Sequence, residues 1–510
     1  MVLTKSSYLS GLQCAKRLWI EAHAPHLLGP TAGVQAQLRE QGREVGVLAR
    51  AAFTEGRLIR GWGQAALAAT HAALAAGATC LFEPAFEHAG VFVRCDILTA
   101  RSDGGWTLVE VKSTTRVKQH HLHDLAVQMW VLQGSGLDVR GAEVMHLNNR
   151  NCVYPNLARL FVRADVTGQV TRLLGKVARQ ATALQRRLVQ KRMPRVGIGP
   201  HCSQPHPCPA TGHCWRDVPP YAVFTIPRIT PDKLNALLKR GILRVHDIPA
   251  DFPLTPYQWA YVRRVKEGRA EIDMGRIRMR LARLRYPIYF LDFETYAYAV
   301  PRFDGMRPFQ QLPFQYSCHV LEADGTLHHR DYLHTGADDP RPRLAQQLVQ
   351  DIGPVGSVVV YHARFERTVL LETARALPEQ RAALRSMAAR LWDQLDIFRY
   401  DYLDPAFEGS NSIKRVLPVL VPELSYSDLA VQRGDQAQAA WMEIIRSRDS
   451  VRRDELAAGL RAYCARDTVA MVEIHRALRR LDSAGLDAEP GTELGTEPRT
   501  EPGTDETRNR

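Results

Sequence analysis

Residues 289–296 read YFLDFETY, an apolar run that carries two acids, Asp292 and Glu294. Side chains on a strand alternate between its two faces, so acids two positions apart lie on the same face. A charge beside a buried strand is costly unless a partner of opposite charge offsets it. The stretch therefore predicts a buried strand whose two carboxylates share a cation.

Two later stretches supply more acids of the same kind. Residues 358–372, VVVYHARFERTVLLE, pass from a β-branched strand into a helical pattern with Glu366 near the helix start. Residues 460–474, LRAYCARDTVAMVEI, form a helix in which Tyr463 and Asp467 share a face. With the two strand acids this gives four hard oxygen ligands, which suit Mg²⁺ or Mn²⁺. Two such ions about 3.5–4 Å apart would clamp the attacking and leaving oxygens of a phosphodiester.

This ordered set resembles the DnaQ-like, RNase H-fold 3′–5′ exonucleases that carry an Asp-Glu-Asp-Asp acid set. HARFE stands where their second motif reads Asn-x-x-Phe-Asp, and YCARD stands where the tyrosine-type third motif reads Tyr-x-x-x-Asp. The resemblance implies that Tyr463 positions the attacking water and that four acids bind the metal, namely Asp292, Glu294, Glu366 and Asp467. The sequence departs from the motif at the second position, where glutamate replaces aspartate.

The wider stretches around these motifs, such as RLWDQLDIFRYDYLDPAFEGSNSIKRVLP, resemble a bacterial domain family of unknown function with this exonuclease-like core. Within them, Asp393 and Asp396 are expected to cap a strand, with support of the site as the alternative. Lys414 is expected on the surface, with contact to a phosphate as the alternative.

A second set of acids lies in residues 85–113, AFEHAGVFVRCDILTARSDGGWTLVEVKS, where two strands flank the polar turn SDGG. Asp96 leaves the first strand, and Glu110 and Lys112 share a face of the second. Asp96 and Glu110 are the expected ligands of one magnesium ion, and Lys112 is expected to orient the water or stabilise developing charge. A surface ion pair is the alternative interpretation of Glu-x-Lys.

This set resembles the PD-(D/E)XK nucleases, in particular the RecB-like, CRISPR-associated iron–sulfur exonuclease branch. Gln128, in HLHDLAVQMWVL, matches that family's Gln-x-x-x-Tyr helix and takes its place in the catalytic set, whereas Leu132 replaces the tyrosine. Gly46 stands where many relatives carry a metal-binding histidine, and Glu44 is the candidate substitute ligand.

Four cysteines form the remaining candidate site. Cys202, Cys208 and Cys214 lie six residues apart in CSQPHPCPATGHCW, and Cys14 stands alone in GLQCAKRLW. Thiolates suit zinc or an iron–sulfur cluster, although paired zinc cysteines are usually two to four residues apart. The family resemblance implies a four-iron four-sulfur cluster, with zinc as the alternative. Its expected role is structural, tying the N-terminal helix to the end of the nuclease domain.

The 510 residues are expected to form an α/β protein with a PD-(D/E)XK restriction-endonuclease-like domain at 1–215 and an RNase H-like mixed-sheet domain at 286–481. Residues 216–285 are expected to form a helical connector that resembles a helix-hairpin-helix around Gly241. Residues 482–510 contain a repeated EPGT-like pattern and are expected to be disordered.

The charge pattern favours a polyanionic partner. The net charge is +13, and the last 29 residues hold 8 acids and 3 bases, so the remainder carries +18. No apolar run reaches the roughly 18 residues of a membrane span, and no signal-peptide core is visible, so a cytoplasmic location without membrane contact is expected. The expected activity is a two-module nuclease acting on DNA ends or single strands. The alternatives are an RNA exonuclease and a nucleic-acid-binding scaffold whose C-terminal domain is catalytically weak because of Glu366.

Overall fold

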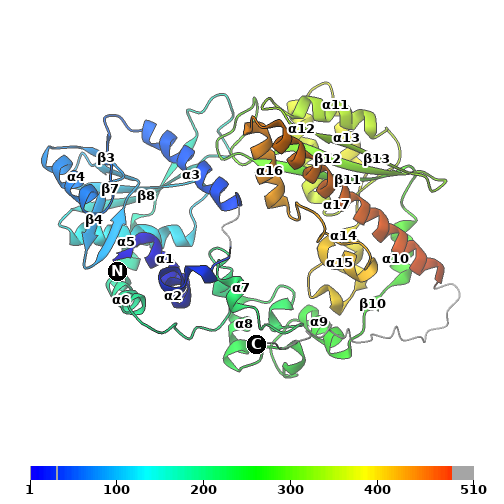
Figure 1. The fold of residues 1–510 in the computed structure, drawn as a ribbon, viewed down its shortest axis with the longest axis horizontal. Coiled ribbons are helices and arrows are strands. Elements are labelled where there is room, and N and C mark those ends of the chain that lie inside the picture. The colour runs from blue at the N-terminus through cyan, green and yellow to red at the C-terminus, as the bar shows by residue number, and fades with distance from the viewer. Residues whose placement is uncertain (1, 30–32, 485–510) are drawn as a thin grey trace, which may run out of the picture.

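The computed structural model describes residues 2–29 and 33–484, and these form an α/β architecture with two large sheets and two small ones (Figure 1). The α/β class predicted from the sequence is confirmed. The tail predicted from residue 482 begins inside helix α17 (Ser450–Ala484), and its remainder, 485–510, lies outside the described residues. In the described part of the chain, no helix is both long and apolar enough to span a bilayer.

The N-terminal region is built on a six-stranded mixed sheet. In spatial order its strands are β2 (Arg57–Leu58), β3 (Cys80–Phe82), β6 (Ile97–Ala100), β7 (Trp106–Lys112), β8 (Val139–Leu147) and β9 (Phe161–Asp165). Strands β6 and β7 form the antiparallel hairpin predicted around SDGG. Strand β8 runs parallel to β7, and the crossover between them is helix α5 (Gln119–Gly134). Leu108, Leu125 and Val144 from these three elements are fully buried together.

A small sheet and several helices cover this region. The small sheet has the order β1 (Leu3–Thr4), β5 (Val91–Arg94) and β4 (Ala85–His88). The helices are α1 (Lys5–Gln13), α2 (Ala15–His23), α3 (Gly33–Ala51), α4 (Gln64–Ala75), α6 (Thr167–Leu188) and α7 (Thr211–Cys214). Asp96 lies in the short break between β5 and β6, where the chain passes from the small sheet to the large one.

The connector forms a compact apolar cluster of its own. Helices α8 (Pro231–Lys239) and α9 (Pro256–Glu267) pack around the buried Leu237, Val245 and Val262. The chain turns at Gly241, as predicted, but the next element is one 3₁₀ turn, η4 (Val245–Asp247), instead of a second α-helix. The last part of the predicted connector packs elsewhere. Helix α10 (Met274–Leu281) buries Ile277 in the C-terminal core, and β10 (Glu271–Ile272) pairs with β16 (Tyr402–Leu403).

The C-terminal region is built on a five-stranded mixed sheet. Its strands, in spatial order, are β13 (Leu327–Leu333), β12 (Gln311–Leu321), β11 (Ile288–Ala297), β14 (Ser357–Val360) and β15 (Leu391–Asp393). The helices are α11 (Arg341–Asp351), α12 (Ala363–Ala376), α13 (Arg381–Ala389), α14 (Leu395–Tyr400), α15 (Ile413–Leu420), α16 (Gly434–Arg446) and α17. The central strand β11 is antiparallel to β12 and parallel to β14.

Strand β11 is covered on both faces, which explains its apolar sequence. Tyr289, Leu291 and Phe293 pack against helices α11, α12 and α13 on one face. Phe290 faces the other way, into the cluster that contains residues of α17. Because side chains alternate, the acids at positions 292 and 294 fall on the α17 side. A β-bulge follows Glu294, a feature common beside active sites.

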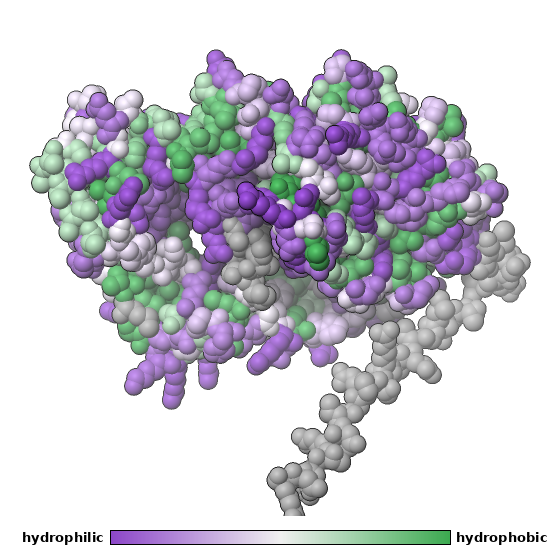
Figure 2. Space-filling model, turned by 45° about the horizontal axis from the view of Figure 1, so that its top comes forward, coloured by the Kyte–Doolittle hydropathy of each residue, from purple (hydrophilic) through white to green (hydrophobic). Residues whose placement is uncertain are grey.

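The two halves also touch directly, without the connector. Helix α3 packs against α16, and the Gln41 side chain donates to Tyr296 Oη at 2.8 Å and accepts from the Ala299 N–H at 2.6 Å. Farther along, the Tyr154 N–H donates to the Met306 carbonyl at 2.9 Å. The connector therefore joins two regions that meet at a second place (Figure 1). On the face in Figure 2, hydrophilic side chains predominate and apolar ones are scattered.

The contact between connector and C-terminal region predicts a strong effect of one glycine. Gly409 has φ +73°, and a Cβ there would lie 1.7 Å from the Thr225 carbonyl oxygen. Gly409→Ala should lower the free energy of unfolding by more than about 2 kcal/mol, because the clash adds to the strain of positive φ. Gly325→Ala is the matched control, since it has φ +89° with nothing within 4 Å and should cost only about 1 kcal/mol. Equal urea-unfolding midpoints for the two variants would contradict this.

Candidate metal centres

The C-terminal acids gather as the sequence predicts, in a group of three. Asp292 and Glu294 from β11 and Asp467 from α17 each place a carboxylate oxygen within 4.8 Å of the other two. In the described part of the chain no other three His, Cys, Asp or Glu side chains are as close. Burial and the charges of neighbouring acids raise the pKa of Asp292 well above its usual value, and burial followed by Asp467 does the same for Glu294. The site is therefore a concentration of poorly solvated negative charge.

Glu366, the fourth predicted ligand, lies near this group without joining it. Its side chain is buried, and its Oε2 atom has no hydrogen-bond partner in the described structure. Its charge helps to raise the pKa of Asp292, so the two carboxylates are close enough to interact. Burial raises the pKa of Glu366 itself to about 8. An unpartnered buried carboxylate beside three others is typical of a site that takes up a cation.

Asp393 holds the helix that carries Glu366. Its carboxylate accepts from the backbone N–H of His362 at 2.9 Å and of Ala363 at 3.0 Å. It thus caps the start of α12 and does not cap a strand, which was the expected role. His362 has φ +95°, a costly conformation for a residue with a Cβ. Asp393 and this strained turn together fix the start of α12, and so fix the position of Glu366 in its first turn.

Three further side chains line the C-terminal group. Tyr463 lies one helical turn before Asp467, as predicted, and burial raises its pKa. Tyr426 Oη donates to Asp467 Oδ1 at 2.7 Å. Lys414 Nζ donates to Tyr463 Oη at 3.3 Å, so this lysine is not the free surface residue that was expected. Sequence reasoning missed Tyr426, because it lies in an irregular segment with no motif around it.

The N-terminal acids also converge, but they are already paired. Lys112 Nζ lies 2.6 Å from Glu110 Oε1 and 2.7 Å from Asp124 Oδ2. Gln128 Nε2 donates to the other oxygen of each, at 2.8 Å and 2.9 Å. Asp124 was not predicted, although Asp-x-x-x-Gln on one helix face was a usable signal. Glu110, Asp124 and Gln128 are all buried.

Lys5, from the first helix, completes this network. Its Nζ lies 3.1 Å and 3.3 Å from the two oxygens of Glu110 and 3.6 Å from Asp124. Asp96 accepts from the Val111 N–H at 2.7 Å, and burial followed by the charge of Glu110 raises its pKa to about 7. Three acids therefore face two lysines, so a metal ion here must compete with Lys5.

Glu44, the candidate substitute ligand on α3, is engaged elsewhere. Its carboxylate forms an ion pair with Arg302 of the C-terminal region, with an N–O distance of 3.0 Å. Glu44 therefore contributes to the contact between the two halves in this structure.

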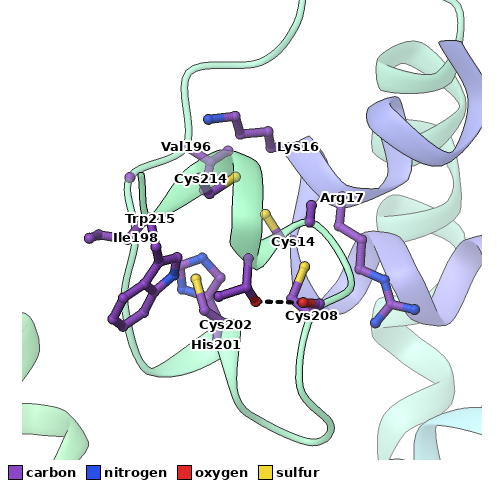
Figure 3. A pocket seen from close by; sticks show the side chains of 13 residues that line it. Cys14, Lys16, Arg17, Val196, Ile198, His201, Cys202, Cys208, Cys214 and Trp215 are labelled. Atoms are coloured by element: carbon purple, nitrogen blue, oxygen red, sulfur yellow. Dashed lines mark hydrogen bonds between the residues drawn. The ribbon is translucent and has the colours of Figure 1, made fainter. Parts of the chain in front are cut away.

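The four predicted cysteines line one cavity, as Figure 3 shows. Cys14 lies between α1 and α2, Cys202 ends the 3₁₀ turn η2 (Pro200–Cys202), Cys208 follows in the loop, and Cys214 ends α7. Burial, and to a lesser degree the charges of Cys202 and Cys214, raises the pKa of the Cys14 thiol. The loop is tied to α1 by Gln13, whose Nε2 donates to two loop carbonyls at 2.8 Å.

The spread of the sulfur atoms bears on what they can hold. A single tetrahedral zinc with bonds of about 2.3 Å brings its sulfurs to roughly 3.8 Å from one another. No three of these sulfurs lie mutually within 4.8 Å, since the group of three acids is alone in meeting that limit among the described residues. A cluster of several atoms needs wider spacing than one ion. The spacing of these sulfurs is wider than a single tetrahedral zinc ion sets.

Comparisons with known proteins find a family match for one segment of the chain. Residues 289–412 match the family described as "Domain of unknown function (DUF2779)", which covers less than half of the chain. A relative, "Uncharacterized protein UU173" of Ureaplasma parvum serovar 3, is 24% identical over 241 residues, 42% of this chain. The chain spans 34% of the length of that relative. A solved structure, "Crystal structure of SSO0001", covers 35% of this chain and 75% of its own, with 11% identity and a TM-score of 0.19.

The burial of Glu366 predicts a pH-dependent stability. Its carboxyl pKa rises from a usual value of 4.5 to about 8 on folding, so between these values the folded protein keeps a proton that the unfolded chain has lost. Stability then falls as pH rises through this window, by at most about 1.4 kcal/mol per pH unit. With chelator present, the melting temperature of the wild-type protein should fall relative to that of Glu366→Gln as the pH rises from 5 to 8. A difference that stays constant over this range would contradict the prediction.

Proposed function

We propose that this protein is a metal-dependent nuclease whose main centre is the C-terminal acid group. The observation that carries the proposal is the convergence of Asp292, Glu294 and Asp467 from separate elements, with Glu366 buried beside them. Within the described residues none of these four acids has an ion-pair partner. Divalent cations would stabilise the charged form of these buried carboxylates, and oxygen ligands such as carboxylates are the kind that Mg²⁺ and Mn²⁺ prefer.

The neighbouring residues support hydrolysis of a phosphodiester. Bound divalent ions would supply an activated water and stabilise charge on the phosphate. Tyr463 would orient that water through its hydroxyl, which Lys414 already holds at 3.3 Å. Tyr426 fixes one oxygen of Asp467, leaving the other for a cation. The mixed sheet and the acids on its central strand support the DnaQ-like, RNase H-fold assignment of this region.

The N-terminal site is proposed as a second and weaker centre. Its hairpin, with Asp96 before it and Glu110 and Lys112 on its second strand, supports the PD-(D/E)XK assignment. Lys5 already neutralises Glu110, so metal binding there carries the cost of displacing an ammonium. The same arrangement favours a second interpretation of this half, in which the N-terminal site binds nucleic acid without cutting it.

The proposed substrate is nucleic acid, with DNA ends or single strands first and RNA as the alternative. The net charge of +18 on residues 1–481 supports a polyanion. The proposed cofactor of the four cysteines is a four-iron four-sulfur cluster with a structural role. Gln13 and Cys14 come from the first helices, so a cluster there would link them to residues 202–214.

Substitution of one acid at each centre tests the two-centre proposal. Asp292→Asn should lower Mg²⁺-dependent degradation of end-labelled single-stranded DNA or RNA by at least about 100-fold, because it removes a shared metal ligand. Asp96→Asn should remove only the weaker activity of the N-terminal centre, which is the activity that Asp292→Asn retains. The exposed Asp338→Asn serves as the control and should leave both unchanged. If metal-loaded protein binds the strands and degrades neither, the scaffold alternative holds.

Removal of one cysteine tests the cluster. Anaerobically purified protein should be brown, with iron and sulfide in equal amounts, and Cys14→Ala should lose the colour and most of the iron. Cys80→Ala, a buried thiol outside the cavity, should keep both. Cys14→Ala should also lower the melting temperature of the N-terminal region, because the link between α1 and the loop is lost. A colourless wild-type preparation that contains zinc would reject the cluster.

A further inference from the structure

Lys414 occupies an unusual place beside the C-terminal acids. It is the second residue of α15, and the buried Val416 and Leu417 fix that helix in the core. Its Nζ lies 4.9 Å from the ring centre of Tyr426 and 5.0 Å from that of Tyr463. The ammonium is thus held between two aromatic faces, an arrangement that stabilises a partly desolvated cation.

Helix stability does not explain this lysine. The N-terminus of a helix carries partial positive charge, so a lysine in the first turn is disfavoured. Within the described residues it has no ion-pair partner either, unlike Lys5 and Lys112 at the other centre. Its charge instead acts at short range on the acid group, where it lowers the pKa of Glu294 and of Asp467.

The hydrogen bonds of the ammonium leave room for a ligand. A lysine has three N–H donors. In the described structure one goes to the Gln432 carbonyl and one to Tyr463 Oη. The third has no partner among the described residues, and the ammonium is close enough to the acids to lower the pKa of Glu294 and of Asp467. An ammonium on a flexible stem is a suitable ligand for a phosphate oxygen.

We propose that Lys414 is the phosphate-binding residue of the C-terminal centre, holding a non-bridging oxygen of the phosphodiester while Tyr426 and Tyr463 hold its ammonium. This rests on the proposed nuclease function and names the side chain that receives the substrate. The same positive charge repels divalent cations from the acid group when no phosphate is bound. Lys414 therefore affects the two ligands in opposite directions.

The opposite effects of Lys414 on metal affinity and on strand affinity distinguish phosphate binding from a structural role. Lys414→Met keeps the stem and removes the charge, so Mn²⁺ should bind at least about threefold more tightly. Affinity for single strands should fall by about tenfold, and the slope of log affinity against log salt should decrease by about 0.7. A lysine that only supports the fold would, when replaced, weaken both ligands together. Lys414→Arg should keep most of the strand affinity, because the charge remains.

The experiment uses the full chain and two separate probes. Mn²⁺ affinity is measured by electron paramagnetic resonance titration. Strand affinity is measured by fluorescence anisotropy with labelled dT12 and rU12, once in chelator and once with Ca²⁺. Arg415→Met is the matched control, since Arg415 lies next in the same helix, is exposed and pairs with Glu408. It removes the same charge and should change neither affinity by more than about twofold.

The outcomes distinguish the inference from the proposed function. If wild-type protein binds Mn²⁺ no better than Asp292→Asn, the metal centre fails and the function with it. If wild-type protein binds Mn²⁺ and Lys414→Met binds Mn²⁺ equally well or more weakly, Lys414 does not oppose the metal. The inference is then overturned. The same holds if Lys414→Met and Arg415→Met bind dT12 and rU12 equally well. A loss with one oligonucleotide alone identifies the preferred strand.

Discussion

The C-terminal region depends on uncompensated negative charge beside its central strand. Asp292 and Glu294 sit on the face of β11 that packs against α17, where Asp467 meets them. Burying these carboxylates costs free energy, and their raised pKa values express that cost. The apolar packing of β11 on both faces offsets it. Proteins depart from the rule of paired buried charge mainly at functional sites, and on this ground we propose the acid group as the chemical centre.

The two acid sites show how the same residue types produce different chemistry. At the N-terminal site, Lys5 and Lys112 lie within hydrogen-bond distance of Glu110, so its charge is satisfied internally. At the C-terminal site the nearest lysine, Lys414, contacts tyrosines instead of acids. A divalent ion therefore has to displace an ammonium from the N-terminal acids, whereas at the C-terminal acids Lys414 opposes it only through its charge, without contacting them. The two sites differ because Lys5 and Lys112 contact an acid directly, whereas Lys414 contacts two tyrosine rings.

Each site is assembled from segments far apart in sequence, and the architecture holds these segments in place. Lys5 and Cys14 bring the first helices to β7 and to the cysteine loop. Gln41 of α3 crosses to Tyr296, two residues after Glu294 on the same strand. The contact between the halves therefore includes the strand that carries the main acid group. The cysteine cavity occupies the junction between the N-terminal region and the connector (Figures 1 and 3).

The sequence by itself determined the α/β class, the SDGG hairpin and the same-face placement of Asp292 with Glu294. These follow from local periodicity, because strand and helix geometry fix the direction of each side chain. The convergence of Asp467 on the two strand acids was expected only from the resemblance of the ordered motifs to a known family. Only the tertiary structure decided that Lys5 pairs with Glu110, that Asp393 caps α12, and that Lys414 lies between two tyrosines. Such contacts join residues from 12 to 105 positions apart. No local pattern encodes them, because a side chain's partner across the fold depends on how whole elements pack.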